Sequence, residues 1–409
     1  MRYRNIHTVF LILLLILFRP STCVYAETDV TKLVRDNTTF AVDLYQKLCT
    51  SEGNIIYSPY SISSVLAVTS AGARGNTEKQ MKKALCLSLD QKRLHPTFAG
   101  LRATINSIQK SGEVSLSLAN SLWPQKDYTF LKTYLSLVKQ NYGVSITPVD
   151  YKHNREAARR TINRWVEDET QQKIRNLIQP GILDSLTKLV LVNAIYFKGN
   201  WDNPFNANLT RDKPFFLPSG KQIQAPMMYR KNSFRYAEFD SLQVLELPYA
   251  GNQLSMIVLL PREKDGLKQL EQSLSVKNLE NWKNNNKKRE TLVYLPKFSM
   301  TIEFRLKQML KSLGMTDAFG LKANFSGMSH ELPGLLIKAV IHKAFVDVNE
   351  EGTEAVAATA VVMRPKANPL QQKPTPVFRA DHPFLFLICE QQTGSILFMG
   401  RVTDPTKKG

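Results

Sequence analysis

The sequence lacks the short motifs that mark common enzyme and metal sites. Its six histidines show no H-x-x-x-H spacing, and no C-x-x-C, G-x-S-x-G, G-x-G-x-x-G or phosphate-loop pattern occurs. Aromatic residues are not interleaved with the basic clusters in the way that single-strand nucleic-acid binders arrange them. These absences argue against metal, nucleotide and nucleic-acid chemistry, and we expect no cofactor and no enzymatic activity.

Long apolar runs and cysteines are also scarce. The apolar run at residues 9–18 is shorter than the roughly 20 residues of a membrane span, and nothing later approaches that length. The basic start, this run and the small-residue pattern at residues 24–26 predict a secretory signal peptide over residues 1–26. Cleavage there leaves Cys49, Cys86 and Cys389, an odd count that implies no disulfide framework. We expect a protein without a membrane span that is secreted, or periplasmic in a Gram-negative host.

Basic residues outnumber acidic ones along the whole chain. Loss of Arg2, Arg4 and Arg19 with the signal lowers the formal net charge from +19 to +16, which is still strongly basic. Such charge favours contact with anionic polymers, although it also serves plain solubility. The candidate cations for a sulfated glycan are Lys79, Lys82, Lys83, Lys92 and Arg93, with Arg155, Arg159 and Arg160 as a second set. The alternative is a solvated basic face.

Helical patterns come early in the chain and strand patterns dominate later. Apolar spacing predicts helices over residues 29–49, 59–72, 95–110 and 154–165, and over 267–282. Ser58-Pro59 predicts one helix start, and Thr77 with Gln80 predicts another as a capping box. Strands are predicted at residues 114–123, 189–197, 291–300 and 337–348, and residues 284–289 are predicted to be a basic loop. This order favours one α+β domain over residues 27–409.

Residues 350–367 form a strand-like stretch without an obvious sheet. Alternation places only small, β-branched or uncharged residues on one face, from Thr353 to Met363. Prolines follow at 365, 369, 374 and 376, which a central strand does not tolerate. An ordinary buried strand that ends in a surface connection is one interpretation.

His342 is a lone histidine within an otherwise apolar strand. Such a residue is more often a hydrogen-bonded core histidine than a catalytic one, and it needs buried polar partners. Ser58, Ser61 and Asn193 lie in equally apolar settings and are the natural candidates.

Five segments of the chain, in order, resemble the signatures of the serpin family. They are N-x-x-x-S-P-x-S at residues 54–61, LVNAIYFKGNW at 191–201, LPKF at 295–298, ADHPFLF at 380–386 and FMGRV at 398–402. The resemblance implies a serpin fold with a five-stranded central sheet, two smaller sheets and eight or nine helices. It also implies an exposed reactive-centre loop over about residues 350–380, a monomer, and a covalent complex with a serine protease.

The same resemblance implies roles for particular residues. Family spacing puts the cleaved bond 14 positions after the hinge glycine, so Gly352 indicates Lys366-Ala367, within one or two residues. Arg364 precedes Pro365 and Lys373 precedes Pro374, which blocks trypsin-like cleavage at both, whereas Lys366 suits an acidic S1 pocket. The secondary specificity residues are then Arg364 and Pro365. The implied hinge is Glu350, Glu351, Gly352, Thr353, Glu354, Ala355, Val356, Ala357, Ala358 and Thr359.

The remaining implied roles concern opening of the central sheet. Ser58, Ser61, Asn193 and His342 resemble the polar cluster under the strands that part, and Trp201 resembles the aromatic residue where the hinge first enters. The predicted function is suicide inhibition of trypsin-like serine proteases. The alternative is a non-inhibitory serpin that acts as carrier, chaperone or storage protein, although the small residues Thr353, Ala355 and Ala357 argue against it.

Overall fold

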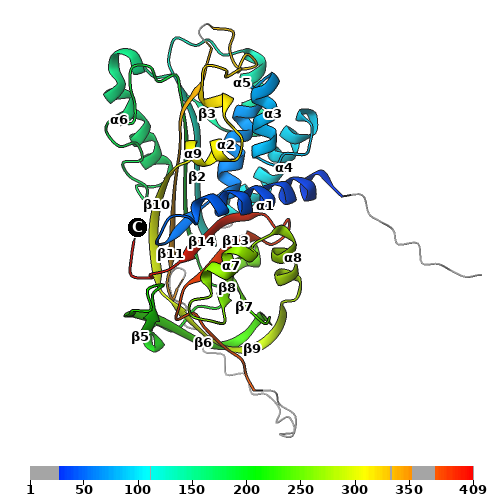
Figure 1. The fold of residues 1–409 in the computed structure, drawn as a ribbon, viewed down its shortest axis with the longest axis vertical. Coiled ribbons are helices and arrows are strands. Elements are labelled where there is room, and N and C mark those ends of the chain that lie inside the picture. The colour runs from blue at the N-terminus through cyan, green and yellow to red at the C-terminus, as the bar shows by residue number, and fades with distance from the viewer. Residues whose placement is uncertain (1–26, 111, 332–333, 352–373, 409) are drawn as a thin grey trace, which may run out of the picture.

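The computed structural model describes residues 27–110, 112–331, 334–351 and 374–408. Within these ranges the helices gather mainly in the upper half of the molecule, as oriented in Figure 1. The helices are α1 (Asp29–Leu48), α2 (Pro59–Ala71), α3 (Gly75–Ala84), α4 (Gln91–Lys110), α5 (Lys132–Asn141), α6 (Tyr151–Glu169), α7 (Leu267–Ser273), α8 (Val276–Asn284) and α9 (Lys307–Ser312).

Five strands form a central sheet in the order β10-β11-β4-β2-β3. Its members are β10 (Phe298–Arg305), β11 (Ile337–Val348), β4 (Leu189–Gly199), β2 (Val114–Pro124) and β3 (Ser145–Ile146). Strands β11 and β4 are parallel neighbours, and β4 is buried nearly throughout. A strand covered on both faces reads as a continuous apolar run, which is why β4 could be recognised from its sequence.

The other nine strands form one continuous sheet, where the family resemblance suggests two smaller sheets. They are β1 (Ile55–Tyr57), β5 (Arg211–Phe216), β6 (Gln222–Glu238), β7 (Leu242–Pro248), β8 (Leu254–Pro261), β9 (Lys287–Pro296), β12 (Val377–Arg379), β13 (Phe384–Glu390) and β14 (Ile396–Val402). The 17-residue β6 joins the two parts because it pairs with β5, β9 and β7 along successive parts of its length.

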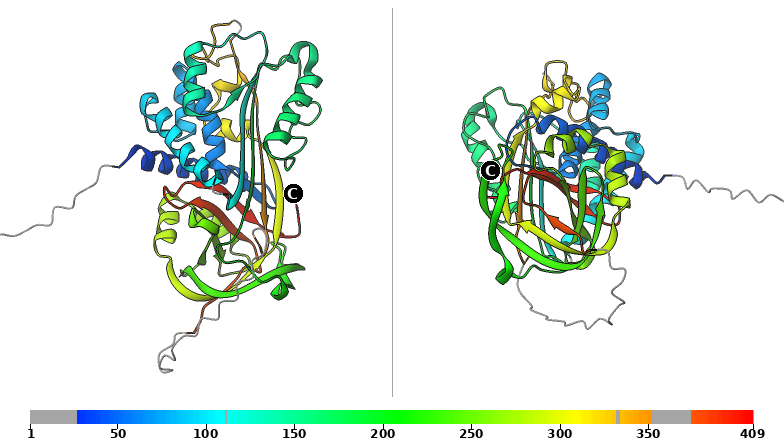
Figure 2. Two further views of the ribbon diagram at one scale, coloured as in Figure 1. Left: turned by 180° about the vertical axis from the view of Figure 1, so that it is seen from behind. Right: turned by 60° about the horizontal axis from the view of Figure 1, so that its bottom comes forward.

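The central sheet is covered on both faces. Helix α6 packs on one face, where residues such as Trp123, Ile162 and Val192 share a buried cluster. Side chains of the opposite face, including Leu191 and Phe197, belong to the main core with α1 and α2. Figure 2 shows the sheet from behind, with α6 on one side and the early helices on the other. No helix in the described ranges is long and apolar enough to cross a membrane.

Local capping explains several helix boundaries, and tertiary contacts explain the predictions that were wrong. Ser58 accepts a hydrogen bond from the Ser61 amide, as predicted. Thr77, in contrast, lies inside α3, which begins at Gly75, and its hydroxyl accepts from the Asn324 amide at 3.0 Å. Residues 267–282 are two helices because Ser275 caps a second start by accepting from the Asn278 amide.

The predicted basic loop at residues 284–289 is only partly a loop, since β9 begins at Lys287 and pairs with β6. Strand pairing therefore overrides the polar composition there. Helices α5 and α9 were not predicted from the sequence.

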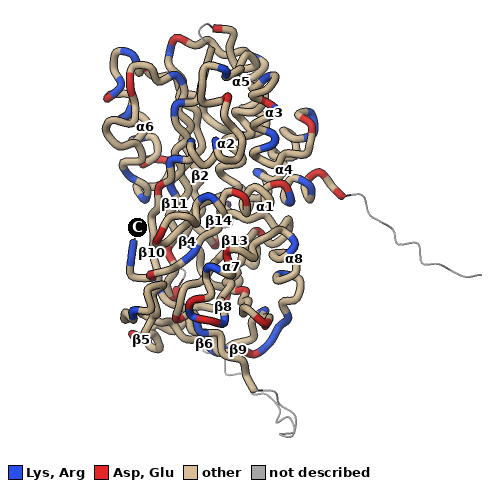
Figure 3. The backbone as a smooth tube through the Cα atoms, viewed as in Figure 1, with Lys and Arg blue, Asp and Glu red and all other residues tan. Residues whose placement is uncertain are grey.

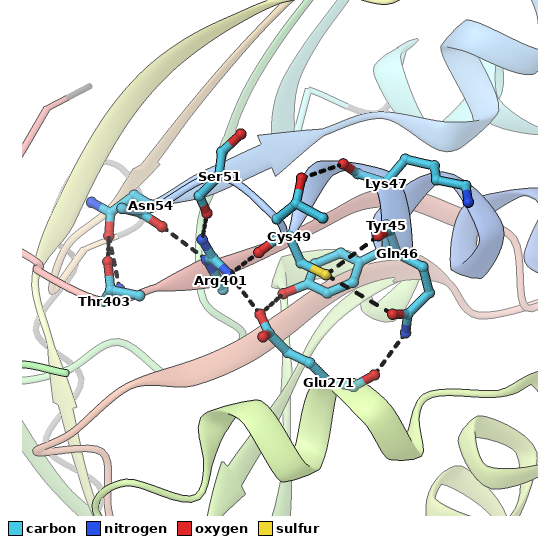
Figure 4. A network of polar contacts seen from close by, with 11 residues as sticks. Tyr45, Gln46, Lys47, Cys49, Ser51, Asn54, Glu271, Arg401 and Thr403 are labelled. Carbon is cyan, nitrogen blue, oxygen red and sulfur yellow. Dashed lines mark hydrogen bonds and ion pairs between the residues drawn. The ribbon is translucent and has the colours of Figure 1, made fainter. Parts of the chain in front are cut away.

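A buried ion pair joins the last strand to α7, and a hydrogen bond links the same carboxylate to the first helix (Figure 4). Arg401 of β14 donates to Glu271 at 2.8 Å, and Tyr45 of α1 donates to the same carboxylate at 2.7 Å. The Arg401 guanidinium also donates to the carbonyl oxygens of residues 49, 51 and 53. Because both charges are buried, loss of either one would leave the other unpaired, at a cost of about 3–5 kcal/mol. Strand β14 also pairs with β1, the first strand in the chain.

Candidate functional site

The parallel β11–β4 pair is the centre of the candidate site. The ladder runs from Ile337 opposite Leu189 to Asp347 opposite Lys198, with His342 opposite Asn193 near its middle. The chain leaves β11 at Val348 and continues through Glu350 and Glu351 to residues 352–373, which lie outside the described residues. A segment that turns back at the end of β11 would run antiparallel to it.

The structure brings the four residues of the predicted polar cluster together. The Ser58 amide donates to His342 Nε2 at 3.1 Å, and His342 Nδ1 contacts Asn193 Oδ1. Asn193 Nδ2 donates to Ser61 Oγ at 2.5 Å. All four residues are fully buried, with no exposed surface. The cluster therefore links α2 to both β4 and β11, so that separation of these strands would break it.

The hydrogen bonds define the protonation state of His342. Nε2 accepts from the Ser58 amide, so the ring proton lies on Nδ1 and is donated to Asn193. Burial lowers the pKa of His342 from 6.5 to about 3. The imidazole is therefore neutral in the closed sheet, and its geometry is that of a structural link rather than a general base.

Asn120 is a fifth member of the cluster that the sequence reasoning missed. It lies on β2 directly opposite Asn193, and its Oδ1 accepts from Asn193 Nδ2 and, at 3.0 Å, from Ser61 Oγ. The available signal was an amide residue in the middle of a strand, the same signal that singled out Asn193. The cluster thus spans three neighbouring strands of the central sheet.

A second contact region lies at the end of β11. The Trp201 indole donates to the Asn349 carbonyl at 2.8 Å and stacks on Tyr249, with ring centroids 4.5 Å apart. The Phe205 amide donates to the Glu350 carbonyl at 2.9 Å. These contacts hold the chain at the point where it leaves the sheet.

The side chain of Glu350 is anchored in the same region. Its carboxylate pairs with Lys297 at 2.7 Å and accepts from the Thr210 hydroxyl at 2.8 Å. Burial alone would raise the pKa of Glu350, but the Lys297 and Thr210 contacts outweigh it and hold this pKa below its usual range. Of the ten predicted hinge residues, only Glu350 and Glu351 are described. The others, Gly352–Thr359, lie outside the described residues, as do Arg364, Pro365, Lys366 and Ala367.

The cations predicted to bind a polyanion lie on and next to α3, but acids are interleaved with them. Lys79, Lys83 and Lys92 are exposed. Arg93 pairs with Asp29 of α1, where acidic and basic residues are mixed (Figure 3), and α3 itself carries one acid, Glu78. The positive charge of the second set, on α6, is similarly reduced because Arg159 pairs with Glu156 at 2.6 Å. Both surfaces are therefore less positive than the lysine and arginine pattern implies.

The three cysteines that follow the predicted signal are free thiols, and no disulfide joins them within the described part of the chain. Burial raises the pKa of all three, and to about 12 for Cys86, whose neighbour Asp43 adds to the effect. These thiols are therefore weak nucleophiles. Among the described residues, no group of three or more His, Cys, Asp or Glu side chains could hold a metal ion.

Comparison with known proteins identifies the family. A family model described as "Serpin (serine protease inhibitor)" matches residues 35–405. The chain belongs to the serpin family. The leukocyte elastase inhibitor of Sus scrofa is 44% identical over 379 residues, which is 90% of this chain and 98% of that protein. The serpin assignment confirms the resemblance drawn from the five motifs.

Solved structures agree with the serpin fold. Uncleaved ovalbumin has a TM-score of 0.82 at 35% identity, covering 91% of this chain and 100% of its own. Human thyroxine-binding globulin, solved in a ligand complex, has a TM-score of 0.82 at 30% identity and covers 93% of this chain and 100% of its own. The serpin is thus an α+β protein related to serine protease inhibitors, as the sequence predicted.

Proposed function

We propose that this serpin traps trypsin-like serine proteases. The protease cleaves Lys366-Ala367, stays attached as an acyl-enzyme, and is carried along as the cleaved segment inserts between β4 and β11. The observation that carries the proposal is the β11–β4 pairing itself, since β11 leads directly into residues 350–367 and its neighbour is parallel. A segment that folded back would enter this ladder antiparallel to both strands.

Insertion is favourable on physical grounds. It replaces one parallel ladder by two antiparallel ones, which are slightly more stable per residue. Residues 353–366 would extend about 46 Å, and the 12-residue β11 extends about 40 Å. About ten added backbone hydrogen bonds at roughly 1 kcal/mol each approach the stability of a whole domain. The uninserted protein is then metastable, and the polar cluster of Ser58, Ser61, Asn120, Asn193 and His342 acts as a gate.

The proposed specificity follows from the residues near the bond. Lys366 is followed by alanine, whereas Arg364 and Lys373 are each followed by proline. A lysine side chain is bound by an S1 pocket with an acid at its base. The porcine relative is named for elastase, so the proposed preference for lysine rests on the loop sequence of this chain alone.

We also propose that the protein is exported and that residues 1–26 are removed. The family match begins only at residue 35, after the basic and apolar segment. N-terminal sequencing of the secreted protein should begin at Glu27.

The proposed polyanion-binding surface on α3 and α4 is tested on a heparin column. Elution at or below physiological salt would refute this binding.

Incubation of the mature protein with trypsin tests inhibition directly. A denaturing gel should show a band at the summed mass of the two proteins, which resists heat and denaturant. Clean cleavage at Lys366 without that band would contradict inhibition and favour a non-inhibitory carrier, chaperone or storage protein.

A further inference from the structure

The residues that flank the segment containing Lys366 are anchored on both sides to β9 or to the residue that follows it. On one side Glu350 pairs with Lys297, the residue that follows β9. On the other, Arg289 donates to the Pro374 carbonyl at 3.5 Å and the Leu292 amide donates to the Pro376 carbonyl at 2.9 Å. Pro374 is only eight positions after Lys366, so the extended chain between them spans at most about 28 Å.

A protease bound at Lys366 is therefore held close enough to contact the body of the protein. A protease domain of ordinary size is about 40 Å across, which exceeds the tether of about 28 Å. The surface next to the anchor is the outward face of strands β12, β9 and β6. We call it the β9 face.

The β9 face carries a row of stacked side chains that crosses three strands. Arg379, Tyr294 and Tyr229 lie directly opposite one another in the two ladders. The Arg379 guanidinium lies 4.1 Å from the centroid of the Tyr294 ring, whose centroid is 4.9 Å from that of Tyr229. Next to this row, Val377 is 42% exposed, an unusual state for a valine within a strand. Tyrosine and arginine are the residues that concentrate binding energy in protein interfaces.

The charge of the β9 face is positive. Along the two ladders that join β12, β9 and β6, the outward positions carry one carboxylate, Glu290, and the cations Lys231, Arg235, Lys288 and Arg379. Beside them, Glu238 at the end of β6 pairs with Arg289. Lys231 pairs with Glu290, and Arg235 pairs with Glu246 of β7. Arg379 has no ion pair within the residues that the structure describes, so the edge of its guanidinium is available to a carboxylate.

We propose that the β9 face is an exosite that binds an acidic surface on the protease engaged at Lys366. This proposal rests on the proposed inhibitory function. A positive patch beside the tether attracts a negatively charged protease and mainly increases the rate of encounter. The exosite would thus select among proteases that share a preference for lysine but differ in surface charge.

The test compares anionic and cationic trypsin, which share the same primary specificity. The second-order rate constant of association is measured for the full mature chain and for Arg379→Glu and Tyr229→Ala. Lys139→Glu on α5, at the other end of the molecule (Figure 1), is the control with the same change of charge. Unchanged circular dichroism and thermal unfolding show that each variant is folded.

We expect Arg379→Glu to slow association with anionic trypsin about tenfold, and Tyr229→Ala to slow it to a similar degree. The association rates of the variants with cationic trypsin, and of the Lys139→Glu control with either trypsin, should change less than about twofold. High ionic strength should remove the effect of Arg379→Glu. The ratio of covalent complex to cleaved serpin should stay constant, because it is set after acylation. Equal rates for wild type and Arg379→Glu, or an equal loss with both trypsins, would overturn the exosite.

Failure of the inhibitory function is distinguished from failure of the exosite by the same samples. If wild type forms no covalent complex with either trypsin, inhibition fails. In that case the rate of cleavage at Lys366 in the intact chain, rather than the rate of covalent complex formation, reports docking of the protease. It should still fall with Arg379→Glu for anionic trypsin alone, and an unchanged cleavage rate would refute the exosite.

Discussion

Acid should loosen the central sheet through His342. In the closed sheet the imidazole is neutral, because burial lowers its pKa from 6.5 to about 3. Once β4 and β11 separate, the ring regains water and its ordinary pKa. The open or unfolded state then binds a proton below about pH 6.5 that the closed state does not. The stability of the closed sheet is therefore full above this pH and falls as the pH drops towards 3.

The size of the loss of stability follows from the lowered pKa of His342. One proton gives a slope of at most about 1.4 kcal/mol per pH unit, and integration from pH 7 to pH 5 gives a loss of about 2 kcal/mol. That loss is large against a stability of roughly 5–15 kcal/mol. His95, whose pKa burial lowers to about 4, adds an effect of the same sign, so the contribution of His342 must be taken as a difference between variants.

Thermal unfolding of wild type and His342→Gln at pH 7, 6 and 5 measures that difference. The variant should start less stable, because the Ser58 amide and Asn193 are less well paired, but its stability should depend less on pH. His153→Gln, at an exposed position on α6, should keep the wild-type slope. If His342→Gln also kept the wild-type slope, His342 would not titrate on opening and the reasoning would be wrong.

Three further changes test the gate and the hinge. Asn120→Ala should lower the free energy of unfolding by about 1–3 kcal/mol in denaturant titrations, because Asn193 loses an acceptor, whereas exposed Ser115→Ala should not. Glu350→Lys removes the ion pair with Lys297 and should speed the loss of monomer on warming, measured on native gels. Adding Lys297→Glu to this variant should restore the ion pair and the wild-type rate. Thr353→Arg should turn inhibitor into substrate on a trypsin gel, since a buried unpaired charge opposes insertion; full trapping would refute the assigned register.

Much of the polar cluster could be predicted because polar residues in apolar strands are conspicuous. Asn193 and His342 interrupt β4 and β11, and each needs a buried partner. Asn120 was less conspicuous, because serines alternate along β2 and one more polar residue does not stand out. The helix start at Ser58-Pro59 was also predictable, since the capping bond joins residues three apart.

Contacts between distant parts of the chain could not be predicted in this way. The ion pair of Glu350 with Lys297 has no local signal, because it depends on how β9 and β11 are placed by the fold. The same cause explains the wrong prediction at Thr77, whose hydroxyl bonds a residue almost 250 positions later instead of capping its own helix. The continuous nine-stranded sheet likewise forms because β6 pairs with β5, β9 and β7 along its length, and the composition of β6 does not reveal these partners.

The pairing of the first strand with the last has a consequence for biosynthesis. Ile55 lies opposite Arg401, so β1 stays without its partner until almost the whole chain has been made. At roughly 5–20 residues per second, the ribosome needs about 20–70 s to cover that interval. During this time the segments around α1 and β1 must be kept from aggregating. A stop codon or truncation before β14 would release a chain that cannot close its core.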